Sequence, residues 1–111
     1  MSQRRELRLS EEIAHMAGDF FARQPHKGSL ITVTHAELSP SFKEATIFFS
    51  VLPEAMEAGA LKYSKRMRSD FREYIKEHSA FHPIPTVDFE LDLGEKNRQR
   101  IDELTRRDKT I

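Results

Sequence analysis

Basic side chains along one segment of the sequence have the clearest chemical meaning. Residues 54–78 have the apolar spacing of a helix, and at about 100° per residue a set of bases falls on the arc opposite its apolar face. They are Lys62, Lys65, Arg66, Arg68, Arg72 and Lys76. A row of ammonium and guanidinium groups can pair with successive phosphates of a nucleic acid. The sequence therefore indicates a surface for a polyanion, although such a charge run is also typical of a plain solvated face.

Both ends of the chain carry further bases. Arg4, Arg5 and Arg8 stand at the start, and Lys96, Arg98, Arg100, Arg106, Arg107 and Lys109 stand near the end. The last segment has too few apolar residues to fold by itself. We therefore expect one domain over residues 1–94, followed by a charged, partly mobile tail over residues 95–111.

Acidic and histidine side chains offer a second chemistry, that of metal binding or acid–base catalysis. Asp88, Glu90 and Asp92 alternate along one predicted strand, where like charges could hold a divalent cation, but a solvated acidic face is the simpler interpretation. His78 and His82 are four apart, yet the proline after His82 argues against a helix there and so against a ligand pair. The sequence also lacks a nucleophile elbow, a P-loop and a dinucleotide-binding glycine motif. We expect no enzyme activity, metal, cofactor or small-molecule substrate.

The elements that position these side chains follow from hydrophobic periodicity. Apolar residues at helical spacing predict a first helix over residues 9–21, whose start is either capped by Ser10 or extended upstream to Arg5. Residues 30–38 and 43–52 alternate as strands and are joined by a short turn, which predicts an antiparallel hairpin. The second strand is apolar on both faces, so we expect it to be central in the sheet.

The second half of the chain completes one layer of helices and one sheet. The helical stretch over residues 54–78 contains the weak helix formers Ser69 and Asp70, where a break into two helices is expected. Residues 87–93 alternate as a third strand, and a helical crossover predicts that it lies parallel to the second strand. The fold class is therefore α+β, in the order α-β-β-α-α-β, with the helices on one face of a three-stranded mixed sheet. This order resembles the type II KH fold.

Composition excludes several other classes of protein. The 111 residues contain 18 Lys and Arg against 18 Asp and Glu, so no overall charge attracts the chain to membranes or nucleic acid. The absence of cysteine excludes disulfides, Cys-ligated zinc and iron–sulfur clusters. No apolar run approaches the length of a membrane span, and the N-terminus does not read as a signal peptide. We expect a cytoplasmic monomer that does not engage membranes.

Several short motifs resemble one protein family. Residues 39–52 begin with Ser-Pro, contain Ala45 and end with Ser-Val-Leu, in the order found in the hairpin of the bacterial ribosome-binding factor A family. Residues 5–13 resemble the first helix of that family, residues 85–89 the start of its last strand, and residues 100–104 its C-terminal Arg-Ile-x-x-Leu segment. The motifs keep this order over most of the chain, which makes the resemblance fairly specific.

The resemblance implies a non-enzymatic assembly factor with a KH-like fold. Members bind the immature small ribosomal subunit, contact its rRNA, assist late maturation and rRNA processing, and support growth in the cold. The RNA-binding residues expected here are Arg4, Arg5, Arg8, Lys62, Lys65, Arg66, Arg68, Arg72, Lys76, Arg98 and Arg100. The family has Ala-x-Gly between its central helices, but this chain has Met67-Arg68-Ser69, so a glycine-dependent RNA contact is not expected. The alternative function is a KH-fold interaction module whose basic face meets an acidic protein.

Overall fold

The chain folds as a single layer of helices against a small sheet. The structure, a computed structural model, describes residues 2–24 and 29–94. Along these residues the elements are α1 (Ser2–Ala22), β1 (Leu30–Leu38), β2 (Glu44–Leu52), the short 3-10 helix η1 (Glu54–Met56), α2 (Glu57–Arg66), α3 (Arg68–His78) and β3 (Thr86–Leu91). This is the predicted α+β order, with η1 as an addition before α2.

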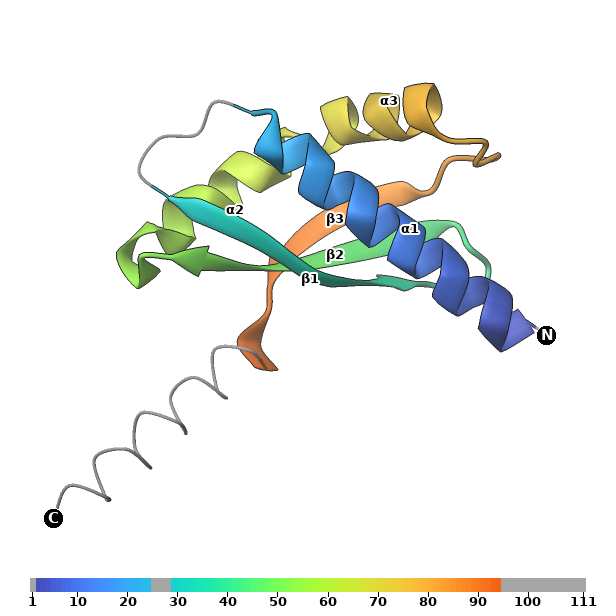
Figure 1. Ribbon diagram of the computed structural model, residues 1–111, viewed down its shortest axis with the longest axis horizontal. Coiled ribbons are helices and arrows are strands. Elements are labelled where there is room, and N and C mark those ends of the chain that lie inside the picture. The colour runs from blue at the N-terminus through green and yellow to red at the C-terminus, as the bar shows by residue number, and fades with distance from the viewer. Residues whose placement is uncertain (1, 25–28, 95–111) are drawn as a thin grey trace, which may run out of the picture.

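The sheet has the order β1-β2-β3, so β2 is the central strand, as its two-sided apolar pattern predicts (Figure 1). Strands β1 and β2 are antiparallel, and their register shifts at a bulge between Val33 and His35. Strands β2 and β3 are parallel and pair from Glu44 with Thr86 to Phe49 with Leu91. The predicted hairpin and the predicted parallel crossover are both confirmed.

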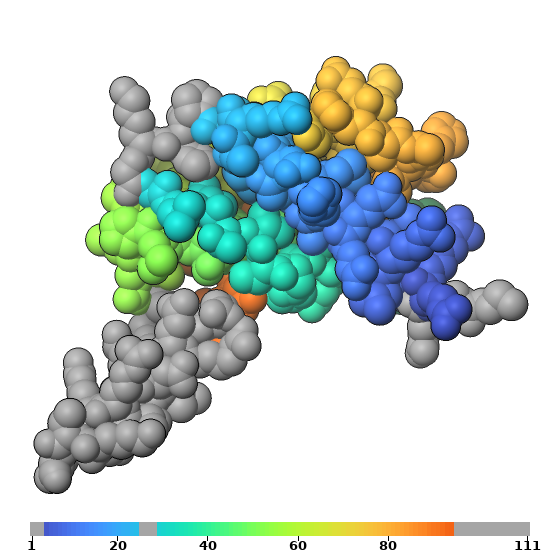
Figure 2. Space-filling model, in the orientation of Figure 1, coloured from blue at the N-terminus to red at the C-terminus, as the bar shows by residue number. Residues whose placement is uncertain are grey.

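The core lies between the helices and one face of the sheet. On that face β2 contributes a fully buried row that ends at Val51, and β3 contributes Val87 and Phe89. Helix α1 lies across β1 in the space-filling view (Figure 2), and it meets α3 through the rings of Phe20 and Phe71, whose centroids are 5.3 Å apart. The opposite face of the sheet is more exposed, as the alternation in the sequence predicts.

The long helical segment breaks at Met67, two residues before the expected position at Ser69 and Asp70. The Met67 N–H donates to the carbonyl oxygens of Tyr63 and Ser64, at 3.2 and 3.0 Å, which ends α2. The Met67 carbonyl then accepts from the Phe71 N–H at 2.9 Å, which starts α3. Because Met67 has φ −90° and ψ 4°, a backbone conformation open to ordinary residues, the break needs no glycine.

Two other boundaries also bear on the sequence interpretation. The start of α1 decides between two alternatives, and the end of β3 differs from the prediction. Helix α1 begins at Ser2, so the upstream extension is correct and Ser10 lies inside the helix, where its hydroxyl donates to the Leu7 carbonyl at 2.9 Å. Strand β3 ends at Leu91 and not at Leu93, because its pairing with β2 stops there. The last hydrogen bond to β2 is donated by the Asp92 N–H, at 2.8 Å. Leu93 is consequently 63% exposed.

Candidate nucleic-acid interface

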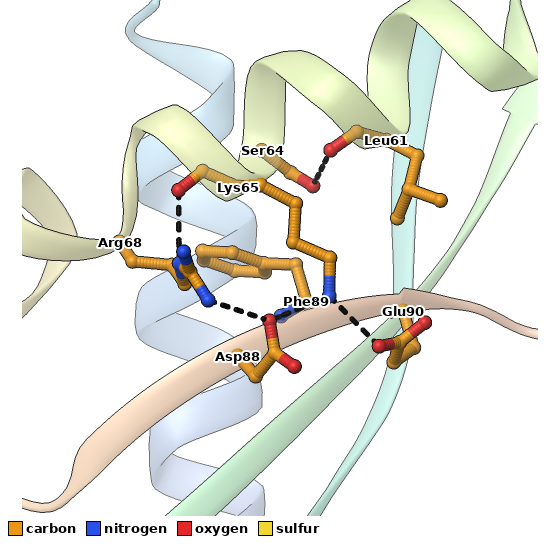
Figure 3. Close-up of polar contacts among 7 residues, drawn as sticks. All are labelled: Leu61, Ser64, Lys65, Arg68, Asp88, Phe89 and Glu90. Carbon is orange, nitrogen blue, oxygen red and sulfur yellow. Dashed lines mark hydrogen bonds and ion pairs between the residues drawn. The ribbon is translucent and has the colours of Figure 1, made fainter.

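The predicted basic stripe divides into two sets of side chains, and the first set turns toward the sheet. We call Lys65, Arg68 and Arg72 the inner bases. Lys65 extends from α2 over β3, where its ammonium donates to Asp88 Oδ1 at 2.6 Å and to Glu90 Oε1 at 2.8 Å (Figure 3). Its side chain is 30% exposed. The interpretation of Lys65 as part of an outward-facing stripe is therefore wrong, because β3 is an edge strand whose carboxylates lie within reach of α2.

The other two inner bases hold backbone and carboxylate oxygens. Arg68 donates from Nε to the Lys65 carbonyl at 2.9 Å and from Nη1 to Asp88 Oδ1 at 3.5 Å, which joins the start of α3 to the same carboxylate. Arg72 donates to the carbonyl oxygens of Pro85 and Ile84, at 3.1 and 3.3 Å. Arg72 thus fixes the loop before β3 to α3. Both side chains remain exposed at their outer surface, and two N–H groups of each guanidinium are already donated to protein oxygens.

The pKa values of Lys65 and Asp88 reflect this pairing. Burial would raise the pKa of Asp88, but the hydrogen bonds from Lys65 and from the Phe89 N–H, together with the Arg68 charge, hold it below its usual value. Burial would lower the pKa of Lys65, but its hydrogen bonds to Asp88 and Glu90 hold it above its usual value. Both shifts favour the charged pair, so this part of the stripe stabilises the fold.

The second set of bases points to solvent. We call Lys62, Arg66 and Lys76 the outer bases. All of them are exposed, and none forms an ion pair with another residue in the described part of the chain. Lys62 and Arg66 are four apart on α2 and so lie on the same side of it. These side chains can meet an external anion without breaking an internal ion pair.

Helix α1 adds Arg4, Arg5 and Arg8, which lie on its first turns because the helix begins at Ser2. All are exposed. Arg5 lies over the ring of Phe42, with its guanidinium carbon 5.9 Å from the ring centroid. The predicted residues Arg98 and Arg100, like the rest of the tail over residues 95–111, lie outside the described residues.

The acidic strand face is partly paired. Besides the contacts of Asp88 and Glu90 with Lys65, Asp92 accepts a hydrogen bond from Thr34 Oγ1 at 2.6 Å and lies 3.6 Å from His35 Nδ1. The interpretation of this face as merely solvated is therefore too simple. No group of at least three His, Cys, Asp or Glu residues in the described ranges is arranged to hold a metal ion.

The two predicted histidine ligand candidates lie in different surroundings. His78 stacks on Tyr74, with ring centroids 3.9 Å apart, and its Nδ1 lies 2.9 Å from the Tyr74 carbonyl oxygen. His82 is exposed on the loop between α3 and β3.

Over residues 2–24 and 29–94 no helix is both long and apolar enough to span a bilayer.

A family model described as ribosome-binding factor A matches residues 2–105, nearly the whole chain. The chain belongs to the ribosome-binding factor A family. It is similar to the ribosome-binding factor A of a Chelativorans species (strain BNC1), at 27% identity over 110 residues, covering 92% of this chain and 80% of that protein. It is also similar to the ribosome-binding factor A of Paramagnetospirillum magneticum, at 29% identity over 105 residues, covering 90% and 74%.

A solved structure of the same family confirms the fold. The crystal structure of ribosome-binding factor A from Thermus thermophilus matches with a TM-score of 0.71 at 16% sequence identity, covering 78% of this chain and 93% of that one. The α+β, KH-like arrangement predicted for this member of the ribosome-binding factor A family is therefore correct.

Sequence reasoning missed a cavity at the end of α1. It is lined by residues of α1, of the β1–β2 turn and of the loop between α3 and β3, among them Phe42, Phe81 and His82. The turn residue Phe42 has φ 60°, which is rare for a bulky residue. No residue type in the sequence signals this conformation, and the segments of the cavity are too far apart in the chain for a motif to reveal it.

Proposed function

We propose that this chain binds the small ribosomal subunit through its rRNA and assists late maturation of that subunit without catalysing a reaction. Membership of the ribosome-binding factor A family supports a role in ribosome assembly. The observation that carries the RNA contact is the set of outer bases, which are exposed and, within the described residues, free of ion pairs. In this proposal the protein acts as a monomer in the cytoplasm, and its role matters most in the cold.

The contact is electrostatic and positions the protein on a folded RNA. Arg and Lys side chains pair with phosphates, and such contacts fix orientation without reading sequence. The outer bases Lys62, Arg66 and Lys76 form one part of this surface. The α1 arginines form a second part. We also propose that Arg98 and Arg100, in the charged tail, add contacts to the same RNA.

The inner bases contribute less to the proposed RNA contact than the sequence interpretation assigned to them. Lys65 is committed to Asp88 and Glu90, and Arg68 and Arg72 each donate two of their five N–H groups to protein oxygens. A phosphate that bound these groups would have to compete with hydrogen bonds that stabilise the fold. We therefore place Lys65, Arg68 and Arg72 at the margin of the RNA surface.

The test is sedimentation of cell extract from cold-grown cells that express the tagged protein. We expect the protein to travel with free small subunits and immature particles, and to move to the top of the gradient after RNase treatment. The control is a variant in which Lys62, Arg66 and Lys76 are all changed to Glu. Sedimentation with a complex that survives RNase would favour the alternative, an acidic protein partner. Absence from the small-subunit fractions would contradict the proposal.

A further inference from the structure

A cavity of about 380 Å³ opens at the N-terminal end of the molecule. Three segments that are far apart in the sequence meet there: the first turns of α1, the β1–β2 turn, and the loop between α3 and β3. Figure 1 shows them together at the end marked N. The cavity is large enough for one nucleotide or a small planar ligand, and too small for a folded partner.

Apolar and aromatic side chains form part of the cavity wall, beside polar ones. Leu9, Phe42 and Phe81 line it, and each of them is half-buried against the hydrophobic core. Phe42 is held in a left-handed conformation, φ 60°, by the turn in which its N–H donates to the Ser39 carbonyl at 2.9 Å. Backbone strain of this kind at a bulky residue concentrates at functional sites. Here it places an aromatic ring in a cavity wall.

The two charged groups of the cavity have opposite signs, and the polar side chains of Ser41 and His82 also line it. Arg5 and Glu12 both line it, and they lie seven residues, about two turns or 10.5 Å, apart on the same face of α1. Leu9 lies between them. A carboxylate at one side would repel a phosphate, so the cavity does not suit a bare anion. It suits a flat molecule with apolar faces, hydrogen-bond acceptors along one edge and donors along the other.

Among nucleobases, guanine has this arrangement. Its O6 and N7 atoms accept hydrogen bonds and match an arginine, while N1–H and the N2 amino group donate on another edge and match a carboxylate. Adenine carries a donor where guanine has O6, so it would face the Arg5 guanidinium with the wrong group. Aromatic side chains stack on unpaired bases of RNA. Phe81 is available for this contact, because Arg5 already lies over Phe42.

We infer that this cavity binds an unpaired guanine of the RNA, with Arg5 and Glu12 reading its two edges and Phe81 stacking on its face. The inference rests on the proposed function, since it names a nucleotide within the RNA that the protein contacts. It differs from the electrostatic surface in kind. The outer bases hold phosphates of any sequence, whereas the cavity selects a base.

The test uses two single-stranded RNA pentanucleotides, one with a central guanine and one with a central adenine, each flanked by uridines. Binding to the full chain is followed by backbone amide NMR and by titration at low salt. We expect the guanine oligonucleotide to bind about tenfold more tightly than the adenine one. The amide shifts should centre on residues 5–12, 41–42 and 80–83.

Three variants separate the parts of the site. Glu12→Gln should reduce the preference for guanine, because it removes the carboxylate that accepts from N1–H and the N2 amino group and leaves only Arg5 to discriminate between the two bases. Its matched control, Glu11→Gln, removes an exposed carboxylate that does not line the cavity and should keep the preference. Phe81→Ala should weaken binding of both oligonucleotides about tenfold. Phe48→Ala, which removes a half-buried ring from the opposite face of the sheet, should not.

The outcomes distinguish this inference from the proposed function. Equal affinity for the two oligonucleotides, or equal loss of preference in Glu11→Gln and Glu12→Gln, overturns the guanine site even if the protein still sediments with small subunits. A guanine preference that depends on Glu12 supports the site even if subunit binding fails. Because Glu11 and Glu12 are exposed, their variants are expected to keep the wild-type circular dichroism melt, so a loss of preference cannot be attributed to unfolding.

Discussion

The inner and outer bases come from the same stretch of sequence but lie in opposite surroundings. Lys65, on α2, is the centre of an ion-pair network with Asp88 and Glu90 on β3. Lys62, one turn earlier on the same helix, points to solvent and is exposed. A helical wheel places both in one basic arc. The comparison shows that a basic stripe on a helical wheel is not a single surface, because carboxylates at the edge of a nearby sheet can form ion pairs with some of its bases.

The difference arises from where β3 lies. As an edge strand it exposes carboxylates on one side, and a lysine from α2 covers them, which also protects the strand edge from pairing with another chain. Within the part of the chain that the structure describes, the outer bases form no such ion pairs, so they remain available. The variants below are designed to break this distinction or to sharpen it, in order of expected effect.

The largest effect is expected for the outer bases. Reversing Lys62, Arg66 and Lys76 to Glu removes the three proposed phosphate contacts and adds repulsion, so we expect the affinity for small subunits to fall about 100-fold. The melting temperature should change little, because these side chains form no ion pairs with other described residues. Fluorescence anisotropy with purified subunits and a circular dichroism melt provide the two measurements. Unchanged affinity would show that the RNA contact lies elsewhere.

A smaller effect, on stability and not on subunit affinity, is expected for Lys65→Met. This change keeps the aliphatic stem but leaves Asp88 and Glu90 without their ammonium partner. We expect a loss of about 1 kcal/mol in the free energy of unfolding, discounted for the partial exposure of the groups, and a melting temperature lower by about 4–8 °C. Subunit affinity should change less than twofold. Lys62→Met is the control and should show the reverse pattern.

The third expectation concerns acid. The pKa of Asp88 is lower in the folded protein than its usual value, so its contribution to stability is complete above the unfolded pKa of about 3.9 and is lost as the pH falls through the folded pKa. Asp88→Asn should therefore be less stable than the wild type at pH 7, by about 0.5–1 kcal/mol after discounting for the partial exposure of Asp88, and this difference should shrink as the pH falls below the unfolded pKa. Urea titrations at a series of pH values measure this. A difference that does not shrink with falling pH would mean that Asp88 acts through packing.

The smallest effect is expected at the helix break. Ser69 is exposed in the first turn of α3. Ser69→Gly should lower the free energy of unfolding by about 0.5 kcal/mol, because glycine loses more backbone entropy in a helix. Subunit affinity should not change, since the break at Met67 already forms without glycine. A gain in affinity on introducing glycine would show that the RNA approaches the backbone there.

The element order, the central position of β2 and the parallel crossover were predictable because each follows from local periodicity. The position of the helix break was not, since Met67 is no helix breaker and the weaker helix formers Ser69 and Asp70 lie inside α3. The ion-pair network of Lys65 could not be predicted either, because its partners lie 23 and 25 residues away in the sequence and meet it only through the packing of α2 on β3. The cavity required three distant segments and the unusual φ of Phe42.

The most direct test of the account is the salt dependence of binding to purified small subunits. The logarithm of affinity is measured against the logarithm of salt between about 50 and 200 mM for three proteins: the wild type, the variant with Lys62, Arg66 and Lys76 changed to Gln, and Arg68→Gln. Each lost phosphate contact lowers the slope by about 0.7–0.9. We predict that the outer-base variant loses about two to three units of slope, while Arg68→Gln keeps the wild-type slope. Equal slopes for all three proteins, or a comparable loss in Arg68→Gln, would contradict the assignment of RNA binding to the outer bases.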